Sequence, residues 1–238
     1  MTTAERGADA VGADAARALG VELRARQVAL DGHEVRVWTA ALDRLAEAAA
    51  VLSRFLSDDE RAQVASMRVP RTAERFCGGR AALRVLLGAE LSCEPASLRF
   101  VVGPHGKPAL EPAAGHGLAF NVAHSAGVVA IAVSRAGDVG IDVERRREVR
   151  ALDRLVVRAL TPDERALFER WIAEGASSLD AFLRAWTVKE ARLKALGLPI
   201  GAGLSRDHAL SRQLPWCPFA LPEGEDYFGA VALSTSRS

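Results

Sequence analysis

The stretch VGIDVERRR, residues 139–147, has the period-two alternation of a half-buried β-strand. Its branched aliphatic residues share one face, and Asp142 and Glu144 share the opposite face with Gly140. Side chains two positions apart on a strand are separated by roughly 6.6 Å, at about 3.3 Å per residue. Two carboxylates at that spacing raise each other's pKa unless a positive charge lies between them. The sequence leaves two sources for that charge: the arginines at 145–147, or a metal ion.

The bulk composition limits the classes of protein to be considered. The chain has 238 residues, enough for one large or two small domains, and 49% hydrophobic residues, enough for a core. A net charge of +1 gives no global reason to expect binding to nucleic acid or to a membrane surface. No apolar run approaches the roughly 18 residues of a membrane helix. We therefore expect only local basic patches to bind anions, and we also expect the protein to be a monomer.

The cysteines argue against a structural zinc site, because they form no CxxC motif and no cluster with histidine. They are odd in number and scattered: Cys77, Cys93 and Cys217. Together with the absence of a signal-peptide pattern, such thiols predict a cytoplasmic location.

The order of predicted elements occurs twice along the chain. A capping box, SDDE at 57–60, precedes a long helix that continues through RFCGGRAALRVLLGAEL at 75–91. A second capping box, TPDE at 161–164, precedes the long helix LDAFLRAWTVKEARLKALGL at 179–198. Besides the strand at 139–144, strands are expected at 33–38, 97–102, 117–123 and 128–134, and near 215–221 and 226–233.

This repeat predicts an α/β (α+β) fold of two similar lobes, related by pseudo-twofold symmetry, with a ligand-binding cleft between them. The predicted lobes are residues 31–136 and 137–238. Residues 1–30 show weak periodicity, and we expect a dispensable extension that is disordered or partly helical.

Three local expectations concern the first lobe. Leucines and an alanine at helical spacing predict one helix over 42–56. Pro70 is expected to end the helix that starts at the first capping box. Gly78 and Gly79 weaken the long helix by about 1 kcal/mol each, which indicates either tight helix packing or the approach of another group to the backbone.

Several side chains have the chemistry of an anion or metal site, although each is also common on ordinary surfaces. Glu190 and Lys194 are four residues apart and share one helix face, as solvated pairs often do. The segment FNVAHSAG, residues 120–127, runs from a strand into a turn of the kind that binds phosphate. Lys107, in the turn GPHGKP at 103–108, is a further candidate for a phosphate contact.

Taken together and in this order, the motifs change the interpretation. The chain resembles the Sfp-type 4′-phosphopantetheinyl transferases over roughly residues 55–200. The most specific matches are G-[IV]-D-[IV]-E, here GIDVE, and W-[ST]-x-K-E-A-x-x-K-A, here WTVKEARLKA. The matching blocks are RFCGGRAALR, GPHGKPAL, FNVAHSAG, VGIDVERR and FLRAWTVKEARLKALG.

The resemblance implies the activity of a holo-[acyl-carrier-protein] synthase. Such an enzyme moves the 4′-phosphopantetheine arm of coenzyme A to a serine of an apo acyl or peptidyl carrier protein and releases 3′,5′-ADP. It implies that Asp142, Glu144 and Glu190 hold Mg²⁺, with Mn²⁺ as a possible substitute, and that Lys194 neutralises charge on the phosphates. Glu190 is either the general base or only a metal ligand. The implied coenzyme A contacts are Arg75, Arg80, Gly106, Lys107, Pro108, Asn121, His124 and Lys194.

Two other functions fit the same residues. One is a non-catalytic module that binds coenzyme A or a carrier protein, and the other is a Mg²⁺-dependent hydrolase of the coenzyme A pyrophosphate. Three acidic residues together with Lys194 argue against the pure binding module, which has no need of a metal. Neither the particular carrier protein nor its biosynthetic pathway follows from the sequence.

Overall fold

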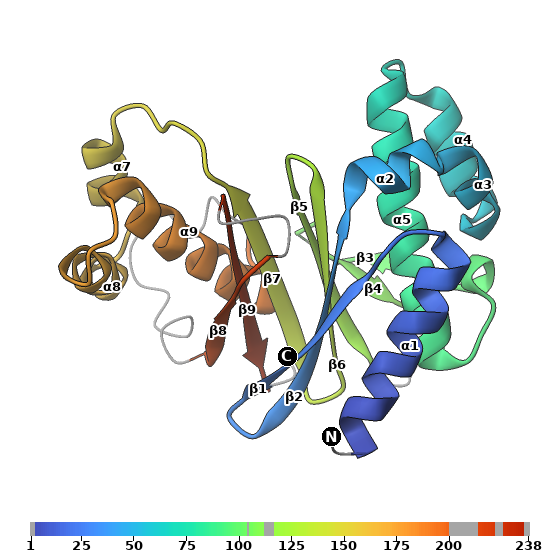
Figure 1. Ribbon diagram of the computed structural model, residues 1–238, viewed down its shortest axis with the longest axis horizontal. Coiled ribbons are helices and arrows are strands. Elements are labelled where there is room, and N and C mark those ends of the chain that lie inside the picture. Colours follow the sequence, from blue (N-terminus) through green and yellow to red (C-terminus); the bar gives the residue numbers. More distant parts are fainter. Residues whose placement is uncertain (1–2, 104, 112–116, 200–213, 222–225, 236–238) are drawn as a thin grey trace.

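The computed structural model describes residues 3–103, 105–111, 117–199, 214–221 and 226–235, and it has two lobes of mixed helix and strand (Figure 1). The first lobe contains α1 (Thr3–Leu19), β1 (Arg24–Leu30), β2 (His33–Ala41), α2 (Leu42–Glu47), α3 (Ala49–Leu52), α4 (Asp58–Ser66), α5 (Pro70–Leu91), β3 (Phe100–Val102), β4 (Pro108–Leu110), β5 (Ala119–Ser125) and β6 (Val128–Ser134), with 3₁₀ turns at Ser53–Phe55 and Pro95–Ser97. The second contains β7 (Asp138–Arg145), α7 (Leu152–Ala159), α8 (Pro162–Ala173), α9 (Ser178–Ala195), β8 (Trp216–Phe219) and β9 (Tyr227–Ser234).

Each lobe is built on an antiparallel sheet. The first has the strand order β1-β2-β6-β5 and the second β7-β9-β8, while β3 and β4 form a separate hairpin. The inner faces of the two sheets share one hydrophobic core, which includes Val37, Ile141 and Val231. The long helices cover the outer faces, α5 with α1 on the first sheet and α9 on the second (Figure 1). The lobe junction is therefore filled with apolar side chains at its centre, and polar contacts are confined to its edges.

Residues 3–30 are more ordered than the sequence predicts for this part of the chain. They form helix α1 and strand β1, which pairs antiparallel with β2. Ala15 and Leu19 of α1 are buried against the first lobe, and Val28 and Leu30 of β1 enter the core between the sheets. This burial and the strand pairing make the segment part of the fold. The sequence did not indicate this, because the partners are too distant along the chain to affect the periodicity of a short window.

The helix expected over 42–56 is broken into α2, α3 and a 3₁₀ turn, with the break at Ala48. The backbone of Leu45 lies so close to Gly78 of α5 that a Cβ at Gly78 would be 2.7 Å from the Leu45 carbonyl carbon. Gly78 therefore serves tight helix packing. Pro70 begins α5 rather than ending α4, which already ends at Ser66, because proline is well suited to the first turn of a helix.

Both predicted capping boxes are present, and each ties its short helix to the long helix that follows. Glu60 is bonded to Arg84 of α5 at 2.5 Å (Nε to Oε2), and Glu164 to Lys189 of α9 at 2.9 Å (Nζ to Oε2). Both cations are buried and also donate to backbone carbonyls. The partners are 24 and 25 residues apart, so the same device occurs at the same spacing in both lobes. This correspondence supports the internal repeat.

None of the helices in the described ranges is long and apolar enough to cross a membrane.

Candidate active site

The alternation predicted for β7 is confirmed. Val139, Ile141 and Val143 are buried in the core between the sheets. The opposite face, which carries Asp142 and Glu144, is directed toward α9 and the edge of the lobe junction. The strand therefore separates its apolar side chains from two carboxylates in the second lobe.

Gly140 lets α9 cross β7 at very short range. A Cβ at this position would lie 2.0 Å from the carbonyl oxygen of Ala191, 2.3 Å from the nitrogen of Ala195 and 2.9 Å from the carbonyl carbon of Lys194. All three atoms belong to the helix backbone and cannot move aside as the end of a flexible side chain can. A glycine within a strand often marks such a backbone approach. Because Gly140 has no side chain, the last turns of α9 can pack directly against the acidic face of β7.

Lys194 lies between two of the predicted carboxylates. Its Nζ atom is 2.5 Å from Oδ1 of Asp142 and 3.7 Å from Oε2 of Glu190. Asp142 is only 4% exposed, and Glu190 is also buried. Residues that are 52 positions apart in the chain thus meet in one buried cluster, and a helix pair that is usually solvated becomes part of a site.

Burial raises the pKa of Asp142 to about 8, and the negative charges of Glu190 and Glu144 act in the same direction, whereas Lys194 opposes the shift. Burial likewise raises the pKa of Glu190, with Lys194 again opposing and Glu144 adding to the effect. The three carboxylates therefore lie close enough to interact electrostatically. One lysine does not fully compensate them, so the cluster favours additional positive charge.

Glu144 is held from two sides. The hydroxyl of Ser125, at the end of β5, is 3.4 Å from its Oε2 atom, and Nη2 of Arg147 is 3.8 Å from the same oxygen. Arg146 instead pairs with Asp180 at the start of α9, at 2.7 Å. Of the arginines at 145–147, Arg147 thus lies near a site carboxylate, and Arg146 is paired elsewhere.

The donor set suits a hard divalent cation. Oδ2 of Asp142 is buried and has no hydrogen-bond partner among the described residues. Carboxylate oxygens in small number, with substrate phosphates to complete the shell, are what Mg²⁺ prefers. Within the described ranges, no group of three or more histidine, cysteine, aspartate or glutamate side chains is arranged so that it could hold a metal ion. Asp142, Glu144 and Glu190 therefore have suitable oxygen atoms, but the structure does not bring all three together as a metal site.

Two predicted coenzyme A contacts connect the lobes. Nζ of Lys107 donates to the carbonyl oxygen of Val139 at 3.0 Å, and Oδ1 of Asn121 accepts from the N–H of Ile141 at 2.9 Å. Burial lowers the pKa of Lys107, with Asp138 opposing. A lysine carries three donors and an asparagine also carries an NH₂ group, so each retains donors for a ligand. The sequence indicated their polarity but not this structural role.

Arg75 and His124 lie at the β5–β6 end of the first lobe. Arg75 pairs with Asp43 through Nε and Nη2, at 2.8 and 2.7 Å from Oδ1. The other carboxylate oxygen of Asp43 borders Gly127 in the β5–β6 turn. His124 is exposed on β5, next to Ser125, which contacts Glu144. Both residues thus lie on the edge of the lobe that approaches the carboxylates.

Arg80 is directed elsewhere in the first lobe. Its guanidinium lies over the rings of Phe76 and Phe100, and its Nε is 3.4 Å from Oε1 of Glu60. Burial lowers its pKa. With Pro108 it lines a cavity of about 850 Å³ between α4, α5 and the β3–β4 hairpin. Gly106, at φ +83°, lies in the turn between β3 and β4. Arg80, Gly106 and Pro108 therefore belong to the surface of the first lobe.

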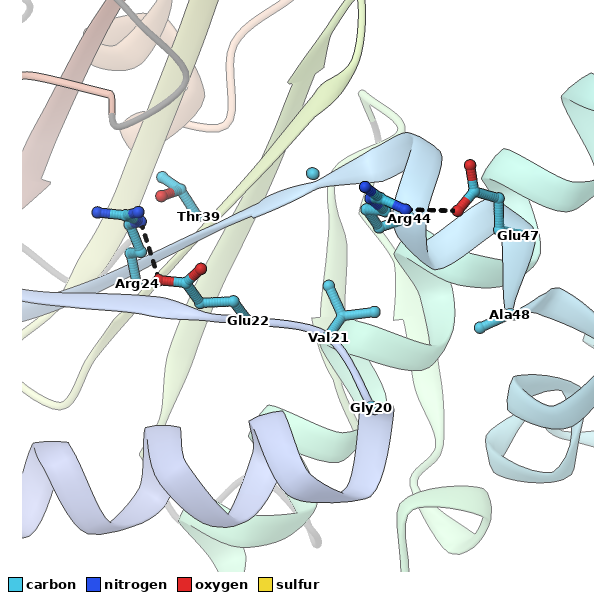
Figure 2. Close-up of a pocket in the computed structure, with 9 residues that line it drawn as sticks. Gly20, Val21, Glu22, Arg24, Thr39, Arg44, Glu47 and Ala48 are labelled. Atoms are coloured by element: carbon cyan, nitrogen blue, oxygen red, sulfur yellow. Dashed lines mark hydrogen bonds and ion pairs between the residues drawn. The ribbon is translucent and has the colours of Figure 1, made fainter.

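Two other cavities contain none of the predicted site residues. One, of about 670 Å³, lies beside α2 and the α1–β1 connection, and Figure 2 shows its arginines paired locally: Arg24 with Glu22 and Arg44 with Glu47. The second, of about 580 Å³, lies between α9 and the strands β8 and β9, and its lining includes the aromatic residues Trp171, Trp216, Phe219, Tyr227 and Phe228. Neither brings carboxylates and a lysine together.

Sequence reasoning missed the roles of Gly140 and Ser125. A signal existed for Gly140, because a glycine on the same strand face as two carboxylates indicates a close neighbour. No local signal identified Ser125, whose contacts are to a strand about 20 residues away.

Comparison with known proteins identifies the family of this chain. A family model described as the 4′-phosphopantetheinyl transferase superfamily matches residues 138–227. The 4′-phosphopantetheinyl transferase HetI of Nostoc sp. is 36% identical over 165 residues, which are 69% of this chain and 69% of that protein. The phosphopantetheinyl transferase of Thraustochytrium sp. is 29% identical over 65% of this chain and 57% of its own. The 4′-phosphopantetheinyl transferase AcpT of Salmonella typhimurium is 39% identical over 48% of this chain and 56% of the AcpT chain. The identity and coverage of the HetI match establish that the chain belongs to the 4′-phosphopantetheinyl transferase family.

Proposed function

We propose that the protein is an Sfp-type transferase that moves 4′-phosphopantetheine from coenzyme A to a serine of an apo acyl or peptidyl carrier protein. The observation that carries this proposal is the cluster between β7 and α9 in which half-buried Lys194 contacts the buried carboxylates of Asp142 and Glu190. Names of relatives in the same family describe this activity. The two lobes within one chain support the Sfp-type architecture.

The proposed metal ligands are Asp142, Glu144 and Glu190, for Mg²⁺ or Mn²⁺. A bound divalent cation supplies charge neutralisation to the coenzyme A pyrophosphate. The unpartnered Oδ2 atom of Asp142 and the excess of negative charge around it support this assignment.

Lys194 and Glu190 have complementary proposed roles in the transfer. The serine oxygen forms a bond to the phosphorus next to pantetheine, while the bond from that phosphorus to the bridging oxygen of 3′,5′-ADP breaks. The Lys194 ammonium is placed to stabilise the negative charge that develops on the leaving phosphate. Glu190 is the candidate base for the serine proton: burial raises its pKa in the metal-free protein, whereas a bound cation would lower that pKa and make it a weaker base.

The proposed coenzyme A contacts come mainly from the first lobe. His124 and Arg75 lie on the lobe edge that approaches Glu144, and Lys107 and Asn121 lie along the same junction with donors to spare. Arg80 and Pro108, which line the cavity beside the β3–β4 hairpin, remain proposed contacts, as does Gly106 in the turn of that hairpin.

Lys194→Ala should lower turnover far more than it weakens coenzyme A binding, because the lysine's charge matters most as the leaving phosphate forms. Steady-state kinetics with a carrier protein, together with calorimetric binding of coenzyme A, measures both quantities. An unchanged kcat with a raised KM would assign Lys194 to ground-state binding instead.

Chelation should abolish transfer, and Mg²⁺ or Mn²⁺ should restore it, because the carboxylate cluster lacks sufficient compensating charge. The measurement is the rate of carrier modification after EDTA treatment and metal addition. Full activity after rigorous chelation would contradict the proposed metal ligands.

Product analysis tests the function itself and separates it from the two alternatives. Several apo carriers are incubated with the protein, coenzyme A and Mg²⁺, and the carrier mass and small-molecule products are determined. The proposal predicts a modified carrier and an equal amount of 3′,5′-ADP. A binding module gives no product, and a pyrophosphate hydrolase gives free 4′-phosphopantetheine with unmodified carriers; either result overturns the proposal.

A further inference from the structure

At the β5–β7 edge the lobes are joined by side chains in place of a strand ladder. In the described sheets, β5 is the last strand of the first sheet and β7 the first strand of the second. Lys107 and Asn121 reach the backbone of β7 near its start and middle. Ser125 makes the third contact, in which its Oγ accepts from the N–H of Arg145 at 3.0 Å. Each contact attaches a polar side chain of the first lobe to the strand that carries the acidic residues.

Ser125 differs from the other two because it also contacts a site carboxylate. A serine hydroxyl has one proton, and since its oxygen accepts from Arg145, that proton is available to Oε2 of Glu144, 3.4 Å away. Arg147 lies on the same carboxylate oxygen, at 3.8 Å. Both contacts therefore involve Oε2, which leaves Oε1 of Glu144 for a ligand.

We propose that Ser125 is a positioning residue, which orients the Glu144 carboxylate for cation binding from the opposite lobe. The inference rests on the proposed function and adds a residue to it. Carboxylates that bind metals are usually hydrogen-bonded by neighbours that fix their orientation, and loss of such a partner typically lowers metal affinity about 10–100-fold. The end of β5 thus couples the lobe junction to the cation site.

The test compares Mn²⁺ binding by the full-length protein, with and without coenzyme A, using electron paramagnetic resonance titration. Ser125→Ala should weaken Mn²⁺ binding roughly 10–100-fold. Ser125→Thr keeps the hydroxyl and should bind Mn²⁺ nearly as well as the wild type. Ser66→Ala, which removes an exposed hydroxyl bonded within α4, is the matched control and should leave Mn²⁺ affinity unchanged.

The melting temperature of each variant is measured beside its Mn²⁺ affinity. A positioning role predicts lower Mn²⁺ affinity in Ser125→Ala, whereas a purely structural role predicts only a lower melting temperature. Equal Mn²⁺ affinity in Ser125→Ala and wild type overturns the inference, whether or not the melting temperature falls. If Ser125→Ala does not fold, Ser125→Cys keeps the size with a weaker donor and should show a smaller loss of affinity; no loss there also overturns it. A wild-type protein that modifies carriers but binds no Mn²⁺ overturns both this inference and the metal assignment, while the transfer activity stands.

Discussion

Glu190→Gln is expected to lower the rate of transfer by roughly 10²–10⁴-fold, the usual range for the loss of a general acid–base group. Glutamine keeps the shape and one carbonyl oxygen but loses the charge and the basicity. Burial raises the pKa of Glu190 in the metal-free protein, which suits a base, whereas a bound cation would lower that pKa, which suits a ligand. The expected rate loss is therefore large in either role, and the dependence on metal distinguishes them.

A Mg²⁺ titration of the transfer rate across pH 5–9 makes that distinction. If Glu190 is the base, the variant should still bind metal and coenzyme A, and the acid limb of the pH–rate profile should disappear. Near-complete recovery of the rate by excess Mg²⁺ would reject the base role and leave Glu190 as a ligand. Glu174→Gln, at the exposed end of α8, is the matched control and should behave as the wild type.

Gly140→Ala is expected to separate the catalytic elements and to destabilise the protein. The new Cβ would lie 2.0 Å from the Ala191 carbonyl oxygen, so α9 has to move away from β7. Overpacking of this kind typically costs about 1–3 kcal/mol of the free energy of unfolding. The same displacement moves Lys194 away from Asp142. We therefore expect the turnover of Gly140→Ala to fall by more than its loss of stability alone would cause.

Denaturant unfolding and transfer kinetics measure these two effects. Gly79→Ala is the matched control, because a Cβ at Gly79 in α5 meets only Leu42 Cδ1 at 3.5 Å. Alanine is the better helix former by about 1 kcal/mol, so this control should be neutral or stabilising. Unchanged stability and turnover in Gly140→Ala would contradict the role assigned to the close crossing of α9 over β7.

The features that the sequence predicts well are those with a short-range physical cause. The alternation of β7, the two capping boxes and the long helices α5 and α9 follow from spacing within a few residues, and the structure confirms them. The carboxylates were assigned to one strand face for the same reason. Their meeting with Lys194 was implied only by the family resemblance, since no local pattern joins residues 52 positions apart.

The features that the sequence does not predict depend on tertiary contacts. The close approach of Leu45 to Gly78 joins residues 33 positions apart, and the burial of α1 and β1 likewise depends on distant partners. Arg84 and Lys189 gave a partial signal, because a cation within an apolar helix segment indicates a buried partner, but the capping glutamates were not identifiable as those partners.

The central claim is that β7 and α9 bring Asp142, Glu144 and Glu190 together to hold a divalent cation beside the coenzyme A pyrophosphate. Anomalous diffraction from crystals of the protein grown with Mn²⁺ and coenzyme A tests it most directly. We expect a manganese peak bound by oxygens of all three carboxylates and by the pyrophosphate, with Lys194 contacting a phosphate oxygen. A manganese peak away from β7, or coenzyme A bound with its pyrophosphate remote from these carboxylates, would contradict it.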